Sequence, residues 1–203
     1  MTTTTKLDEL TGDYVLDTAR TRIGFAVRQT ITKVRGQFDE FEGSMSLDGD
    51  DPSKSSVRLT ILTSSIQTRN QRRDDHLRRS FLGTADHPSI TFDSTNVVQA
   101  GRTTFKVTGD LTIRGVTKPV TLYFDLTGAE DDPEGNLRVV LEGTATINRK
   151  DWGVVWNAAA EGAGLLLGHK VFLEFEATAI HPALTDTRPW AFTSPGLSAP
   201  RVR

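Results

Sequence analysis

Residues 105–127 read FKVTGDLTIRGVTKPVTLYFDLT. Apolar or small residues occupy every second position of this stretch, first from Phe105 to Ile113 and again from Val120 to Leu126. A period of two is typical of a β-strand that buries one of its faces. Gly115 lies between the two runs and marks a turn, so the stretch predicts two long consecutive strands.

The same alternation recurs along the chain. Six further runs show it: residues 23–27, 34–38, 57–61, 90–92, 137–147 and 171–177. Turn-forming residues such as Asp48-Gly49 separate several of the runs. Because closing such a meander removes its exposed edges, we predict an all-β fold, an eight-stranded antiparallel lipocalin-like β-barrel. A two-sheet sandwich is the alternative, although its strands are usually shorter.

Two segments interrupt the alternation. Residues 68–82 predict a short helix, because Thr68 and Gln71 resemble a capping box and Arg73, Leu77 and Phe81 share one face. Residues 152–168 are apolar and glycine-rich without a clear period, which predicts a capping loop over one barrel end. Polar and proline-rich ends complete the division: residues 1–12 as a flexible N-terminal tail, 13–181 as the barrel domain and 182–203 as a flexible C-terminal tail.

Composition narrows the chemistry. The chain has no cysteine, which removes disulfides, thiolate metal sites and a cysteine nucleophile. No two of His76, His87, His169 and His181 have metal-ligand spacing, so we expect no metal and no cofactor. A net charge of -2 gives no overall bias toward nucleic acid or an anionic membrane. The polar N-terminus and the absence of a long apolar run predict a cytoplasmic protein without stable membrane insertion.

The inner faces of the eight strands carry the functional argument, because every residue assigned to them is uncharged. If Gly36, Gly109, Gly143 and Ala145 leave a void there, that void is apolar and suits a hydrocarbon; if they do not, the barrel is solid. The predicted ligand contacts are Phe25, Val27, Phe38, Leu59, Ile61, Phe92, Phe105, Val107, Leu122, Phe124, Val139, Leu141, Trp152, Trp156 and Phe175. Arg73 and His76 are predicted to meet an anionic head group.

Six short motifs occur in a recognisable order. They are YVLD (14–17), IGF with VRG (23–25 and 34–36), RDDHLR (73–78), HPSITF (87–92), TGDLTIRGVTKPV (108–120) and NRKDWG (148–153). Together they resemble the YceI-like family of polyisoprenoid-binding proteins, from about Gly12 to His181. The resemblance implies an extended lipocalin-like barrel that holds a long polyprenyl chain in its interior, and it implies binding rather than turnover.

The hypothesis from sequence is therefore a protein that binds an isoprenoid lipid, such as a polyprenyl phosphate or a quinone, for carriage, storage or sequestration. No enzymatic activity and no nucleic-acid partner are expected, and a homodimer is compatible with the sequence. Two alternatives stay open. One is an enzyme that acts on an isoprenoid-linked substrate through the cluster Arg73-Asp74-Asp75-His76. The other is a stress-related interaction protein whose barrel is filled by its own side chains.

Overall fold

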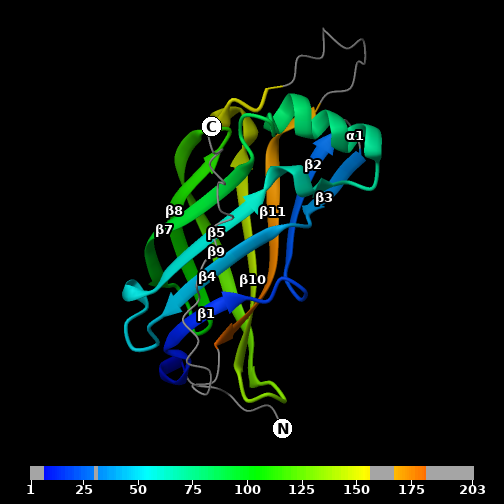
Figure 1. Cartoon of the computed structure of the whole chain (residues 1–203). Helices are drawn as coiled ribbons and strands as arrows, with labels where there is room; N and C mark the ends of the chain where they lie inside the picture. Colours follow the sequence, from blue (N-terminus) through cyan, green and yellow to red (C-terminus); the bar gives the residue numbers. More distant parts are fainter. Residues whose placement is uncertain (1–6, 30–31, 156–166, 182–203) are drawn as a thin grey trace, which may run out of the picture.

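A computed structural model describes residues 7–29, 32–155 and 167–181, and it confirms the predicted barrel. All strand pairs are antiparallel, and a single short helix lies across one end (Figure 1). The strands are β1 (Gly12–Leu16), β2 (Arg22–Gln29), β3 (Thr32–Phe38), β4 (Phe41–Leu47), β5 (Ser56–Leu62), β6 (Ile66–Gln67), β7 (Ser89–Gln99), β8 (Thr104–Ile113), β9 (Val116–Asp131), β10 (Leu137–Asn148) and β11 (Leu167–His181). The helical elements are η1 (Leu7–Leu10), η2 (Pro52–Lys54), η3 (Thr63–Ser65), α1 (Gln71–His76), η4 (Leu77–Leu82) and η5 (Arg149–Trp152).

These eleven segments occupy eight strand positions. The ring runs β1-β4-β5-β7-β8-β9-β10-β11, and it closes where β1 pairs with β11 through Val15 and Ile180. The remaining segments β2, β3 and β6 follow the same pairing order from β11 outward. Each of them extends the strand position of β1, β4 or β5 toward the helix, so three neighbouring strands are broken in two. We call the end where α1 lies the upper end and the end where η1 lies the lower end (Figure 1).

Three of the broken pieces, β1, β4 and the two-residue β6, were not predicted as strands. β4 reads FEGSMSL and continues from β3 after Asp39-Glu40, two acidic residues that hide the continuity of the apolar positions. β1 begins at Gly12, close to the predicted boundary of the N-terminal tail. Within that predicted tail, η1 places Leu10 in the barrel interior, where it is 3% exposed. The predicted C-terminal tail, residues 182–203, lies outside the described residues.

A β-bulge changes which face of β7 is buried. Ser94 pairs with Gly109 and Asn96 with Thr108, so Thr95 is an extra residue on β7. The bulge shifts the alternation by one residue, and Val97 becomes buried while Val98 becomes exposed. A strict period of two therefore describes β7 only as far as Ser94, two residues beyond the end of the predicted run.

The helix begins later than predicted. Asn70, not Thr68, is the N-cap, and its side-chain oxygen accepts a hydrogen bond from the backbone N–H of Arg73 at 3.0 Å. The prediction of a capping box starting at Thr68 is wrong because the Thr68 hydroxyl is bonded to Asp74 instead. After His76 the chain continues as a π-helix, η4, and Gly83 caps its end in the left-handed conformation.

The small residues of the inner faces do not leave voids of their own. The ring of Phe124 lies over Gly143, where an added Cβ would come within 2.2 Å of it, and the ring of Phe25 covers Gly36 in the same way. In both pairs the glycine and the phenylalanine are direct cross-strand partners. Each ring thus lies against the barrel wall, because the glycine opposite carries no side chain.

A second group of buried side chains lies at the lower end. Leu10, Tyr14, Met45, Val139 and Ala179 form a separate buried cluster there. The hydroxyl of Tyr14 donates a hydrogen bond to the carbonyl of Leu10 at 2.9 Å, which ties η1 to β1. Burial raises the pKa of Tyr14 to about 12, so its hydroxyl remains a donor.

We expect Gly143→Ala to lower the melting temperature, because the new methyl group would displace the Phe124 ring from the wall. The cost should be about 1–3 kcal/mol of unfolding free energy, as for other overpacked cores. The matched control is Gly128→Ala in β9, where the nearest atoms lie at 3.7 Å and little change is expected. Calorimetric melting of both variants checks this, and equal melting temperatures would contradict the wall position of Phe124.

Candidate ligand-binding cavity

The barrel encloses an apolar cavity with two chambers. The upper chamber has a volume of about 280 Å³ and the lower chamber about 130 Å³. Five side chains line both chambers, namely Ile23, Leu59, Phe92, Leu122 and Phe175, so the chambers are neighbours along the barrel. An apolar cavity of about 150 Å³ in a protein core stays dry and admits a molecule as large as benzene. The barrel is therefore hollow, and a solid core is excluded for its middle and upper parts.

The helix forms the roof of the upper chamber. Leu77, Phe81 and Leu82 point into it from η4, while strands such as β2, β8 and β11 supply the walls. Phe81 and Leu82 are both buried, so the apolar face predicted from the spacing of Leu77 and Phe81 is the face that covers the cavity. This contact holds the short helix in place, since six residues of α-helix are too few to be stable alone.

Arg73 reaches the upper chamber from α1 in a fixed orientation. Its Nε donates to the Thr68 hydroxyl at 2.7 Å, and its Nη2 donates to the Thr68 carbonyl at 2.8 Å. The same hydroxyl donates to the buried carboxylate of Asp74 at 2.5 Å. Arg73 and Asp74 therefore both bond to Thr68, and these bonds hold the Arg73 guanidinium in one orientation.

Arg149 also lines the upper chamber and was missed from sequence. It lies in η5, is 7% exposed, and donates from Nε to the carbonyl of Gly168 at 2.9 Å. Its guanidinium lies 5.9 Å from the centre of the Phe81 ring, and burial lowers its pKa from the ordinary value. The sequence hinted at Arg149 through the motif NRKDWG. That motif supported the family resemblance, but it gave no reason to place the arginine at the cavity.

The charges of the upper chamber have one sign. Arg73 and Arg149 line it together with His76, and no Asp or Glu occurs among the described residues of its lining. His76 is held by an edge contact with the Phe81 ring at 5.4 Å between centroids. Such a wall, otherwise apolar, suits a molecule with a long hydrocarbon part and an anionic or strongly polar end.

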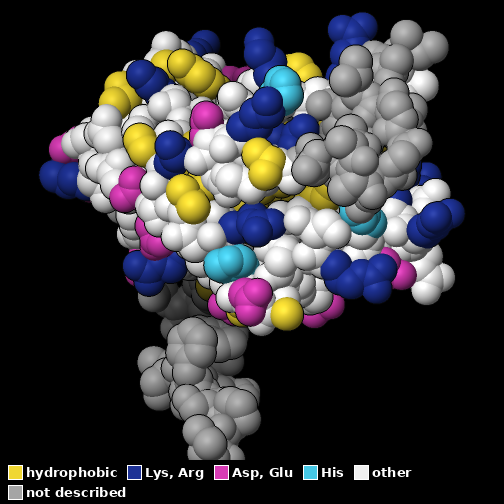
Figure 2. Space-filling view, turned by 90° about the horizontal axis from the view of Figure 1, so that it is seen from above, with side chains coloured by type: hydrophobic (Ala, Val, Ile, Leu, Met, Phe, Trp, Pro, Cys, Tyr) yellow, Lys and Arg dark blue, Asp and Glu magenta, His cyan; other side chains and the backbone are white. Residues whose placement is uncertain are grey.

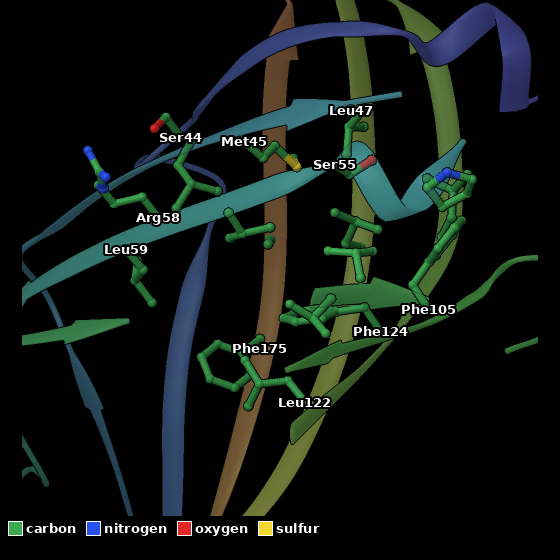
Figure 3. Close-up of a pocket in the computed structure, with 18 of the residues that line it drawn as sticks. Ser44, Met45, Leu47, Ser55, Arg58, Leu59, Phe105, Leu122, Phe124 and Phe175 are labelled. Atoms are coloured by element: carbon green, nitrogen blue, oxygen red, sulfur yellow. The ribbon is translucent and has the colours of Figure 1, made fainter. Parts of the chain in front are cut away.

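The lower chamber is almost entirely hydrocarbon and aromatic. Figure 3 shows Met45 and Leu47 of β4 facing Phe105, Phe124 and Phe175 across the cavity. The charged residues at its margin are engaged elsewhere.

Arg58 donates from Nε to Asp93 at 2.7 Å on the outer surface, and Asp48 accepts the backbone N–H of Asp51. No charged group at the margin is thus turned toward a ligand in the lower chamber.

The predicted contact residues can now be placed. The cavity is lined by Phe25, Val27, Phe38, Leu59, Ile61, Phe92, Phe105, Val107, Leu122, Phe124, Leu141 and Phe175, with Arg73 and His76 at its upper end. Two residues do not line it: Val139 lies in the packed lower cluster, and the indole of Trp152 donates to the Leu111 carbonyl at 3.0 Å within the core. Trp156 and most of the predicted capping loop lie outside the described residues. Ligand contact itself stays a prediction for all of them.

The profile of the YceI-like domain matches residues 14–179. This chain belongs to the YceI-like family. A UPF0312 protein of Staphylococcus aureus is 36% identical over 170 residues, which cover 82% of this chain and 95% of the relative. A UPF0312 protein of Pseudomonas aeruginosa is 44% identical over 120 residues, 59% of this chain, and the match spans only 62% of that relative's length.

Solved structures share the fold. BcnA of Burkholderia cenocepacia superimposes with a TM-score of 0.70 at 20% identity, over 80% of this chain and 98% of its own. A polyisoprenoid-binding domain from Saccharophagus degradans, implicated in plant cell wall breakdown, superimposes with a TM-score of 0.64 at 17% identity, over 83% and 98%. At these identities the comparison establishes the YceI-like barrel and nothing finer. Within the described residues, no helix has the length and apolar character to cross a membrane.

We expect Val107→Phe to leave the melting temperature nearly unchanged, because its ring can enter the lower chamber that Val107 lines. The matched control is Val139→Phe, which adds the same ring to the packed cluster and should cost about 1–3 kcal/mol. Thermal unfolding without ligand compares the two. A large loss in Val107→Phe would mean that the lower chamber cannot accept added volume.

Proposed function

We propose that this YceI-like protein binds a long isoprenoid lipid inside the barrel and carries, stores or sequesters it without chemical change. The observation that carries the proposal is the two-chamber apolar cavity with two arginines at one end only. Polyisoprenoid binding by a structural neighbour from Saccharophagus degradans agrees with this ligand class. Polyprenyl phosphates and quinones share the required form, a long hydrocarbon with a polar end.

The charge distribution favours one orientation of the ligand. An anionic head group would lie beside Arg73 and Arg149, where a low local dielectric strengthens charge-assisted hydrogen bonds. The hydrocarbon would run past the waist at Phe92 and Leu122 toward the lower chamber. The packed cluster around Tyr14 would then limit the length of chain that the barrel accepts.

An enzyme remains the second candidate, and the geometry favours it less. The described residues contain no group of three or more side chains that could hold a metal ion. Ser80 and His76 are neighbours, yet 3.4 Å separates the hydroxyl from Nδ1, and Ser80 is exposed on the helix four residues away. A nucleophile activated by histidine usually lies at about 2.6–3.2 Å and faces the substrate.

Binding is tested with purified protein stripped of lipid. Isothermal titration with a solubilised long-chain polyprenyl phosphate or quinone should give saturable binding with a decrease in heat capacity, the signature of apolar burial. The recovered lipid should have an unchanged mass. Absence of binding across such a panel would overturn the proposal, and a changed mass would support the enzyme instead.

Head-group recognition is tested with Arg73→Gln. We expect affinity for a polyprenyl phosphate to fall roughly tenfold or more, since a hydrogen bond to a charged group contributes about 1.5–3 kcal/mol. Affinity for the uncharged polyprenol of equal length should change little. The control Arg79→Gln removes an exposed arginine of η4 that does not line the cavity. Equal losses for both ligands in Arg73→Gln would mean that Arg73 acts only through the fold.

A further inference from the structure

We propose that the upper end of the barrel is a docking surface for an anionic lipid bilayer. The chain has a net charge of only -2, but its charges are separated along the barrel axis. The separation concerns described residues on the outer surface, so it is distinct from the cavity and from the ligand proposed for it.

Basic residues gather at the upper end. Three exposed arginines, Arg69, Arg72 and Arg79, lie on or just before the helix, while Arg73 lines the cavity and Arg78 pairs with Asp75. Four exposed basic residues lie at the strand ends around the helix: Arg28 on β2, Lys33 on β3, Lys150 on η5 and Lys170 on β11. Figure 2 views this end from above and shows lysine and arginine side chains distributed around it, with acidic side chains between some of them.

Acidic residues gather at the opposite end. The loop between β4 and β5 carries Asp48, Asp50 and Asp51, and the hairpin between β9 and β10 carries acidic residues at four of the positions 130–134. Over the loop 48–54 the only basic residue is Lys54, which pairs with Asp51 at 3.4 Å. A negative surface would therefore attract the upper end and repel the lower end, which fixes the direction of approach.

Exposed apolar side chains accompany the basic ones. Val155, which follows η5, is 61% exposed, and Val116 at the tip of the β8–β9 hairpin is 37% exposed. Basic residues that surround a few exposed apolar side chains are the pattern of proteins that lie on the bilayer interface, where the apolar groups enter the headgroup region. A nucleic acid would use the charges and leave the two valines without a role. We therefore favour the bilayer.

The proposal is tested by co-sedimentation of the whole protein with vesicles. Phosphatidylcholine vesicles are compared with vesicles of equimolar phosphatidylcholine and phosphatidylglycerol, at ionic strengths from about 20 mM to about 500 mM. We expect binding to the anionic vesicles alone, and we expect it to weaken steeply as salt rises. The readout needs no bound isoprenoid, so it can succeed where the proposed lipid binding fails, and the reverse.

Two double variants of equal charge locate the surface. Arg72→Gln with Arg79→Gln removes two exposed charges from the upper end, while Arg102→Gln with Lys106→Gln removes two exposed charges elsewhere. Each charge near an anionic surface changes partitioning about fivefold. We expect the first pair to weaken vesicle binding tenfold or more and the second to stay within about twofold of the parent. Melting temperatures confirm that both variants fold.

Three results would overturn the proposal: no binding to the anionic vesicles at low salt, equal losses in both variants, or equal binding to both kinds of vesicle. Binding of a DNA duplex that is stronger than vesicle binding and is lost in the first variant would also overturn it, in favour of a nucleic-acid surface. A further variant, Val155→Asp, should weaken vesicle binding without changing any binding to DNA, and an unchanged vesicle affinity would argue against interfacial insertion.

Discussion

The barrel stays closed because one edge of β11 pairs with two different strands, while its other edge pairs with β10. The first half of β11 pairs with β2 and its second half with β1, where Val15 meets Ile180. If β11 paired with neither β1 nor β2, the eight-stranded sheet would have two exposed edges. Closing the barrel removes both of them. At the junction between the partners, the backbone of Thr178 would lose its ladder bonds. Its carbonyl accepts the N–H of Asp17 at 2.9 Å, and its N–H donates to the hydroxyl of Thr21 at 3.0 Å. These two hydrogen bonds keep the barrel closed at the point where β1 ends and β2 has not yet begun.

Closure alone would give a filled barrel, because eight strands leave room only for side chains or one small ligand. The position of the phenylalanine rings decides between these outcomes. Phe124 lies over Gly143 and Phe25 over Gly36, so two of the largest inner side chains are spread along the wall. The space along the axis remains open as a result. The same glycines were considered from sequence as sources of voids, and they do create space, although indirectly: they make room for rings that would otherwise occupy the centre.

Periodicity predicted the strands whose inner residues are uninterrupted. β8, β9, β10 and β11 could be placed from it, and so could the class of fold. It failed where the chain deviates from a regular ladder: at the acidic pair Asp39-Glu40 before β4, at the bulge of β7, and at the short β1. For the site, the inner apolar residues followed from the strands, and Arg73 followed from its place on the helix. Arg149 could not be found in this way, because a lone arginine after a strand has no period and its burial depends on η5 folding back over Phe81.

The polar end of the cavity depends on the same local structure that caps the barrel. Arg73 contacts the chamber because Thr68 holds its guanidinium, and Thr68 is in turn fixed by the buried carboxylate of Asp74. Asp74 is buried because η4 presses α1 onto the barrel through Phe81 and Leu82. Arg149 lies against the face of that same Phe81 ring. The apolar roof and the guanidinium groups of Arg73 and Arg149 are consequently one structural unit. A substitution that displaced the roof from the barrel would also move these two charges. This coupling explains why a helix of so few residues can define both the closed end of the cavity and its polarity.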